Sequence, residues 1–260
     1  MNAMALFSDT RYIFIRYIKK LIRTPILLFF SLFQPILFLV LFTQLLTKLG
    51  NYPGILPAGV SYLEFASAGI LLQNAFGSAL QSGNSIVADI DTGFLAKMLV
   101  TPVTRPAILL GRLTSDAFRV VVQTAIILGL AYVLGAHVTT GIVGILLIFF
   151  TLAFFGLAWS GISLAIGMRT RSSETVFAIG GVITFPLLFL SPALFPTSFL
   201  PTWVSDVSMF NPVSYAINAS RALMINGYEW GTILPAWGVI GLLALITLSA
   251  TLYQFRKVVS

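Results

Sequence analysis

Long apolar runs constrain this chain more than any other feature of its sequence. Six runs hold roughly 20 or more mostly apolar residues each, the length that a helix needs to cross the hydrocarbon core of a bilayer. Such runs are too long for the strands of a membrane barrel, so each is predicted to be a helix. The predicted fold is an all-α integral membrane protein with six transmembrane helices, at about 25–47, 62–82, 110–134, 141–168, 175–195 and 233–255.

The composition agrees with a lipid environment. Of the 260 residues, 58% are hydrophobic and only 9% are charged, and the mean hydropathy is +0.97. Soluble domains carry about 25% charged residues. A soluble fold of this length could not bury so much apolar surface. We therefore expect one transmembrane domain over 1–260, with no second domain and no internal repeat.

The positive charges predict how the chain is oriented. Of the 15 Lys and Arg residues, all but Lys48 and Arg221 fall in or beside 1–24, 83–109, 169–174 and 256–260. An excess of Lys and Arg marks the cytoplasmic side of a membrane protein. Both termini are therefore predicted to be cytoplasmic, in the plasma (inner) membrane. The net charge of +7 is explained by topology, and no nucleic-acid partner is expected.

The segment at 8–24 is predicted to be an amphipathic interfacial helix. In "RYIFIRYIKKLIR" (11–23), Arg16, Lys19, Lys20 and Arg23 share an arc of about 100° when placed at helical spacing. The opposite side is apolar, which suits the boundary between lipid headgroups and acyl chains. Two interpretations remain open: a membrane-surface anchor, or a helix whose basic side also contacts a cytoplasmic partner.

The segment at 83–106 is the most polar and most sharply punctuated part of the chain. It includes the start of "DTGFLAKMLVTPVTRPAILLGR" (91–112), where Pro102 and Pro106 disfavour helix at the residues before them. We expect a short cytoplasmic helix, a tight turn and re-entry into the membrane at Ala107. Exposed apolar residues on such a helix could dock on another protein; an ordinary connector resting on lipid is the alternative.

Two segments together resemble one family, the ABC-2 type permeases of ABC transporters. The first is "DIDTGFLAKMLVTPVTRPAILLGR", which is similar to the intracellular loop after the second span of that family. The second is "SPALFPTSFLPTWVSDVSMFNPVSYAINASRALM" (191–224), which resembles the segment between spans 5 and 6 of the daunorubicin-resistance-type and nodulation-type exporters. The length and the six-span layout also agree. Within 196–232 we expect short re-entrant helices on or in the outer leaflet.

The resemblance implies partners and a docking surface. Permeases of this family pair into a dimer, of identical or of different chains, and two copies of a separate ATPase subunit supply ATP and Mg²⁺ chemistry. The helix near 86–100 would act as a coupling helix. The docking residues carried over to this sequence are Asp89, Asp91, Phe94, Leu95, Lys97 and Met98, with Arg16 and Lys20 from the N-terminal helix.

Polar residues within the spans are candidates for function, because polar groups in lipid need partners or a wet cavity. Gln34, Gln73 and Asn74 lie in spans 1 and 2, which the resemblance places around the substrate path, together with span 5. The alternative is that they bond neighbouring helices. Near the inner end of span 3, Arg112, Asp116 and Arg119 are spaced as a helical charge ladder. We expect a self-neutralised cluster with both arginines extending to the interface; a proton relay is the alternative.

The expected function is the permease subunit of an ATP-driven exporter of an amphipathic drug, lipid or lipid-linked glycan. The sequence has no Cys, one His (His137) and no phosphate-binding G-x-x-x-x-G-K-[ST] motif, so we expect no enzyme activity, metal or cofactor on this chain itself. The alternative is an ion- or proton-coupled secondary transporter. Such proteins usually carry charges at the membrane midplane and matched halves, and neither pattern is found here.

Overall fold

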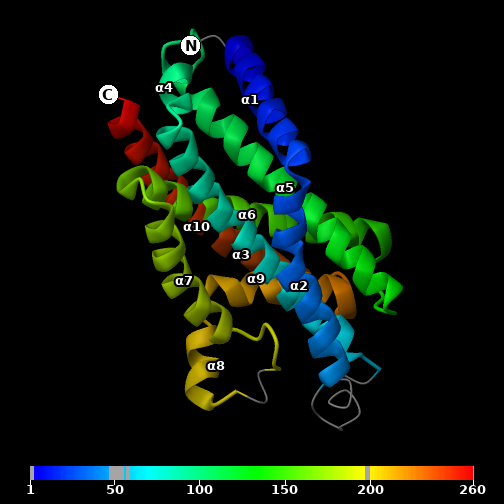
Figure 1. The fold of residues 1–260 in the computed structure, drawn as a ribbon. Helices are drawn as coiled ribbons and strands as arrows, with labels where there is room; N and C mark the ends of the chain where they lie inside the picture. The colour runs from blue at the N-terminus through cyan, green and yellow to red at the C-terminus, as the bar shows by residue number, and fades with distance from the viewer. Residues whose placement is uncertain (1–2, 47–55, 57–58, 197–199, 260) are drawn as a thin grey trace.

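The computed structural model describes residues 3–46, 56, 59–196 and 200–259, and the regular elements among them are all helices (Figure 1). The predicted all-α class is therefore confirmed for the described chain. The elements are α1 (Ala3–Arg23), α2 (Pro25–Leu45), α3 (Tyr62–Asp91), α4 (Phe94–Leu99), α5 (Arg105–Val133), α6 (Gly141–Thr170), α7 (Ser173–Phe189), α8 (Thr202–Ser208), α9 (Pro212–Arg221), the π-helix η3 (Ala222–Asn226) and α10 (Trp230–Val259).

Four helices of the described chain contain a segment that is long and apolar enough to cross a membrane: Leu28–Leu45, Arg105–Val133, Gly141–Thr170 and Trp230–Lys257. Helix α7 is apolar but has only 17 residues, and α3 has 30 residues with more polar side chains. The chain is thus a multi-pass membrane protein. The count of six spans remains a prediction, in which α3 and α7 would supply the second and fifth spans.

Several helix ends differ from the predicted spans. Helix α7 ends at Phe189, six residues before the predicted end at 195, and the Leu190 amide closes its last turn by donating to the Pro186 carbonyl at 2.8 Å. The carbonyls of Pro192 and Ala193 are thereby free to bond side chains elsewhere. Helix α3 runs past the predicted end at 82 without a break to Asp91. The predicted end of span 1 at residue 47 lies outside the described residues.

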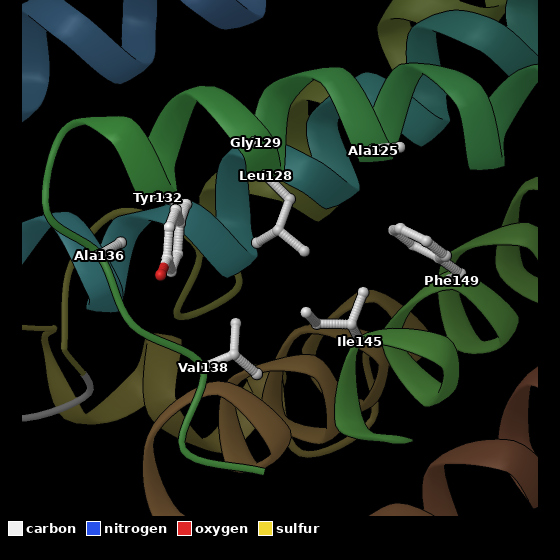
Figure 2. Close-up of a pocket in the computed structure, with 8 residues that line it drawn as sticks. All are labelled: Ala125, Leu128, Gly129, Tyr132, Ala136, Val138, Ile145 and Phe149. Carbon is white, nitrogen blue, oxygen red and sulfur yellow. The ribbon is translucent and has the colours of Figure 1, made fainter. Parts of the chain in front are cut away.

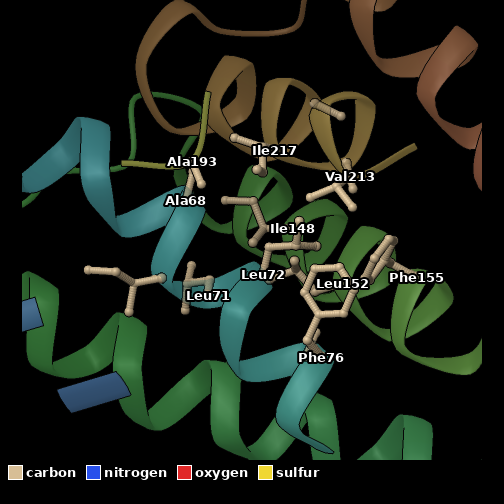
Figure 3. Close-up of a cluster of buried hydrophobic side chains, with 14 of the residues drawn as sticks. Ala68, Leu71, Leu72, Phe76, Ile148, Leu152, Phe155, Ala193, Val213 and Ile217 are labelled. Atoms are coloured by element: carbon tan, nitrogen blue, oxygen red, sulfur yellow. The ribbon is translucent and has the colours of Figure 1, made fainter. Parts of the chain in front are cut away.

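Helix α3 lies at the centre of the bundle, and Figure 3 shows its side chains packed against α6 and α9. Phe76 meets the rings of Phe155 and Trp159 edge-on, at centroid distances of 5.0 and 4.7 Å. Gly69 lies so close to the backbone of Ala193 that an added Cβ would overlap its carbonyl oxygen. Small residues that let backbones approach are typical of helix contacts in membranes.

A second, smaller core forms where α1, α4, α5 and the last turns of α3 meet. Figure 1 shows α1, α4 and the N-terminal half of α5 together at one end of the molecule, near the C-terminus. Leu95 and Met98 of α4 are buried there against Ile13 of α1 and Ile108 of α5, among others. This end corresponds to the predicted cytoplasmic side, and it holds most of the residues that the sequence predicted to dock.

Candidate functional site

The carboxylate of Asp89, in the last turn of α3, is the centre of the site. Only 2% of the residue is exposed. It accepts hydrogen bonds from Arg112 Nη1 at 2.9 Å and from the Tyr17 hydroxyl at 2.7 Å. Arg16 and Lys20 approach its other oxygen at 3.6 and 3.7 Å. These five residues, which we call the Asp89 network, join α1, α3 and α5 through one buried charge.

Arg112 is fully enclosed and does not extend to the interface, which corrects the expectation from its spacing. It donates to Tyr17 and to the Ser82 carbonyl as well as to Asp89. Asp116 instead accepts a hydrogen bond from Ser82 and lies 3.8 Å from Arg119. The predicted ladder is therefore split, because α3 crosses α5 at this level and offers Arg112 a closer carboxylate than Asp116.

The neighbouring positive charges keep the Asp89 carboxylate ionised. Burial raises the pKa of the Asp89 carboxyl, but Arg112, the hydrogen bond from Tyr17, and the Lys20 and Arg16 charges together outweigh it and hold that pKa below its usual range. A depressed carboxyl pKa stabilises the fold above the unfolded pKa of about 3.9 and loses that effect only in stronger acid. The Asp89 carboxylate should thus stay ionised throughout the physiological pH range.

The buried Tyr17 hydroxyl should make the stability of the chain depend on pH in the alkaline range. Burial above all raises the pKa of its hydroxyl to about 12. The neutral hydroxyl therefore contributes stability below about pH 10, its unfolded pKa, and that contribution is lost as the pH rises toward 12. We expect the wild type to lose on the order of 2 kcal/mol more stability over this interval than Tyr17→Phe does. Thermal unfolding of both proteins between pH 8 and 12 measures the difference, and parallel curves would contradict it.

Helix α4 sits directly on the network. Gly93 has φ +67°, a left-handed conformation that lets the chain turn sharply from α3 into α4. The guanidinium of Arg16 stacks over the Phe94 ring at 3.4 Å. Of the residues predicted to dock, Leu95, Met98 and Asp89 are buried within this chain, so they hold α4 in place. Asp91 and Lys97 are exposed, and so is Val100 just after the helix, with 86% of its surface free.

A contact that the sequence analysis missed secures the turn after α4. Asp9 of α1 accepts hydrogen bonds from the amide and the hydroxyl of Thr104, at 2.8 and 3.0 Å. Thr104 precedes the Arg105-Pro106 start of α5. Both ends of the α4 segment are therefore tied to α1, one through Asp89 and one through Asp9. Nothing local in the sequence links Asp9 to residue 104, so spacing alone could not find this pair.

Comparison with known proteins decides the family. The family model described as ABC-2 type transporter matches residues 8–225. The chain belongs to the ABC-2 type transporter family. It is 30% identical over 200 residues to the daunorubicin resistance ABC transporter permease protein DrrB1 of Streptomyces coeruleorubidus, covering 77% of this chain and 69% of that protein. It is 29% identical to the putative transport permease ycf38 of Pyropia yezoensis, covering 94% and 84%.

A third relative extends the family comparison. The probable doxorubicin resistance ABC transporter permease protein DrrC of Mycobacterium tuberculosis is 27% identical over 157 residues, covering 59% of this chain and 56% of that protein. The match of the family model spans α1 to η3, so the Asp89 network and α4 both lie inside the ABC-2 region. The resemblance inferred from the two sequence motifs is thus confirmed.

The predicted path residues of this ABC-2 chain lie in different environments. Gln34 is exposed on α2, whereas Asn74 is buried in α3 and Gln73 is half-buried. Gln73 Oε1 and Asn74 Nδ2 are both enclosed without a hydrogen-bond partner in the described chain. Gln123 donates through Nε2 to Ser31 at 2.8 Å and bonds α5 to α2, although its Oε1 is also enclosed without a partner in the described chain. Buried polar groups without partners are costly, so Gln73 and Asn74 are stronger candidates for a functional role than the exposed Gln34.

Arg221, at the opposite end of the bundle, has a role that its sequence neighbours did not predict. Its guanidinium stacks over the Phe65 ring at 3.7 Å and donates to the carbonyls of Pro192, at 2.6 Å, and of Phe65 and Ala193. It thereby ties the end of α9 to α3 and to the chain after α7. Its position as one of two basic residues outside the segments predicted to be cytoplasmic was the available signal.

Proposed function

We propose that this chain is the membrane subunit of an ATP-driven ABC-2 exporter and that a separate ATPase subunit docks on the exposed side of α4. Asp91 and Lys97 would contact the ATPase directly, and Val100 would add an apolar contact. Asp89, Leu95 and Met98 would hold α4 in position from the side that faces the rest of this chain. Phe94, which packs under Arg16, belongs with this supporting set. ATP and Mg²⁺ would bind the partner.

The observation that carries the proposal is that the rest of the chain holds α4 firmly in place. Its apolar side is buried in the second core, and both of its flanks are tied to α1 through buried or half-buried carboxylates. Helix α3 continues from its contact with α4 along the bundle to Tyr62. A displacement of α4 by ATPase closure would therefore move α3, α1 and α5 together as packed elements, not as a loose loop.

The second permease copy would use the apolar surface of α2. Phe29, Phe30 and Phe33 are all more than half exposed on this helix. Two copies with six spans each would enclose the cargo path, with Gln34, Gln73 and Asn74 contributing from spans 1 and 2. We propose a homodimer, although two different permease chains would use the same surface. The distribution of Lys and Arg supports the plasma (inner) membrane, with both termini cytoplasmic.

The proposed cargo is amphipathic: a drug, a lipid or a lipid-linked glycan. The chain contains 22 Phe but only 8 Tyr and 4 Trp, which favours apolar contacts over sugar stacking. The relatives named for daunorubicin and doxorubicin resistance are consistent with a drug-like cargo. The cargo would leave toward the outer solution or the outer leaflet when the two copies reorganise.

Purification in mild detergent or nanodiscs from the native membrane, followed by mass spectrometry, tests this function. We expect a stoichiometric soluble protein with a Walker A motif to accompany the chain, and transport in vesicles to require ATP. A chain that purifies with no such protein and transports cargo on an ion or proton gradient would establish the secondary-transporter alternative.

A further inference from the structure

An apolar groove lies between α5 and α6, far along α5 from the Asp89 network. Its volume is about 340 Å³. Figure 2 shows Leu128 and Tyr132 pointing from α5 toward Val138 and Ile145, with Phe149 closing the far side. The turn at 134–140 closes the end near Tyr132. The only side-chain polar atom among the lining residues is the Tyr132 hydroxyl.

Water is a poor occupant of this groove. An ordered water needs two to four polar partners, and the lining offers almost none. Both walls belong to helices that are long and apolar enough to cross a membrane. The medium beside them is therefore hydrocarbon, and an open apolar hollow in hydrocarbon should be filled by it.

We propose that this groove is a binding site for one acyl chain of a membrane phospholipid. Tyr132 and His137 mark its headgroup end: their rings meet edge-on at 5.9 Å, and both side chains are exposed. Tyrosine prefers the interface between headgroups and acyl chains. From Tyr132 to Ala125 the groove follows α5 for about 10 Å toward the middle of the bilayer. An acyl chain would lie along this direction.

The acyl chain would contact a turn that supports the segment after α9. Ala136 and Val138 line the groove, and the next residues of the same turn hold η3. The Thr139 amide donates to the Met224 carbonyl at 3.0 Å, and the Thr140 hydroxyl donates to the Leu223 carbonyl at 2.6 Å. A bound acyl chain would therefore brace η3 through this turn. Lipid at this site would stabilise the end of the molecule opposite α4.

Glycine positions provide a matched pair of variants. An added Cβ at Gly129 meets no atom within 4 Å, so Gly129→Leu should place its side chain in the groove from α5. Gly238, exposed in α10, has equally open space and lies outside the groove. The two substitutions change helix propensity alike and differ in whether they occupy the site. Ala125→Phe fills the same groove from about one turn nearer its inner end.

Photolabelling of the full chain tests the site. The chain is reconstituted in phosphatidylcholine vesicles that contain a small fraction of phosphatidylcholine with a diazirine on one acyl chain, then irradiated and mapped by mass spectrometry. We expect labels on the groove residues to exceed those on the exposed α10 residues Leu245 and Ile246 severalfold. Gly129→Leu and Ala125→Phe should remove that excess, whereas Gly238→Leu should retain it.

A stability measurement gives an independent readout. Phosphatidylcholine added to the detergent-solubilised chain should raise the midpoint of thermal unfolding of the wild type and of Gly238→Leu by more than that of Gly129→Leu. Groove labelling no denser than that of α10 would overturn the proposal. So would a disulfide between two copies formed by Ala125→Cys, because a second copy would then cover the groove. Neither result depends on the ATPase.

Discussion

Replacing Asp89 by Asn is expected to cost about 3–5 kcal/mol of stability, the largest loss expected from any single substitution considered for this chain. The substitution preserves the shape of the side chain but removes the carboxylate that forms the ion pair with the fully enclosed Arg112 guanidinium. It also replaces the charged acceptor of Tyr17 by a neutral one and removes the charge that pairs with Arg16 and Lys20. Thermal unfolding in detergent, followed by tryptophan fluorescence, measures the loss.

Asp91 is the matched control for this experiment. It lies two residues away and is exposed, so Asp91→Asn should change stability by no more than about 0.5 kcal/mol. The double variant Asp89→Leu/Arg112→Leu should recover part of the lost stability, because removing both buried charges costs far less than leaving one of them unpaired. Equal stability of Asp89→Asn and Asp91→Asn would show that the Asp89 network does not hold this end of the bundle together.

The double variant Lys97→Glu/Val100→Asp is expected to lower the amount of ATPase that purifies with the chain at least tenfold. A tenfold change in binding corresponds to about 1.4 kcal/mol, which loss of one apolar contact and reversal of one charge can supply. Both side chains are exposed, so the fold of the chain should be unaffected. Quantitative mass spectrometry of the purified complex measures the ratio of the two subunits.

The choice of these positions follows from the structure. Phe94 and Met98 are among the residues that the sequence predicted to dock, but Met98 is only 8% exposed and Phe94 lies under Arg16. Their replacement would disturb both the contacts that hold α4 in place and the docking surface. Asp206→Lys, exposed in α8 at the other end, is the control for charge reversal. Unchanged ATPase recovery with Lys97→Glu/Val100→Asp would place the docking surface elsewhere.

The sequence predicted features that depend on neighbours along the chain. The basic stripe of α1 follows from helical spacing, and the short helix α4 with the turn after it follows from Gly93, Pro102 and Pro106. The family followed from two motifs. Helix α3 was harder to delimit, because its polar residues mask a helix that continues to Asp91.

Contacts between distant segments could not be predicted in this way. Arg112 had Asp116 as its visible partner at helical spacing, and only the crossing of α3 over α5 brings Asp89 closer. The same holds for Asp9 with Thr104. The sequence also did not show that Leu95 and Met98 are core residues. An apolar residue on a short helix gives the same sequence pattern whether it faces a partner protein or the core of its own chain.

Site-specific photocrosslinking in the native membrane tests whether an ATPase docks beside α4. A photoreactive amino acid replaces Val100, beside α4, or Asp206, in α8, and crosslinked proteins are identified after irradiation. We expect the probe at position 100 to capture a protein with a Walker A motif and the probe at position 206 not to do so. Capture at position 206 and not at 100, or no such protein at either position, would contradict the assignment of α4 as the element that couples this permease to an ATPase.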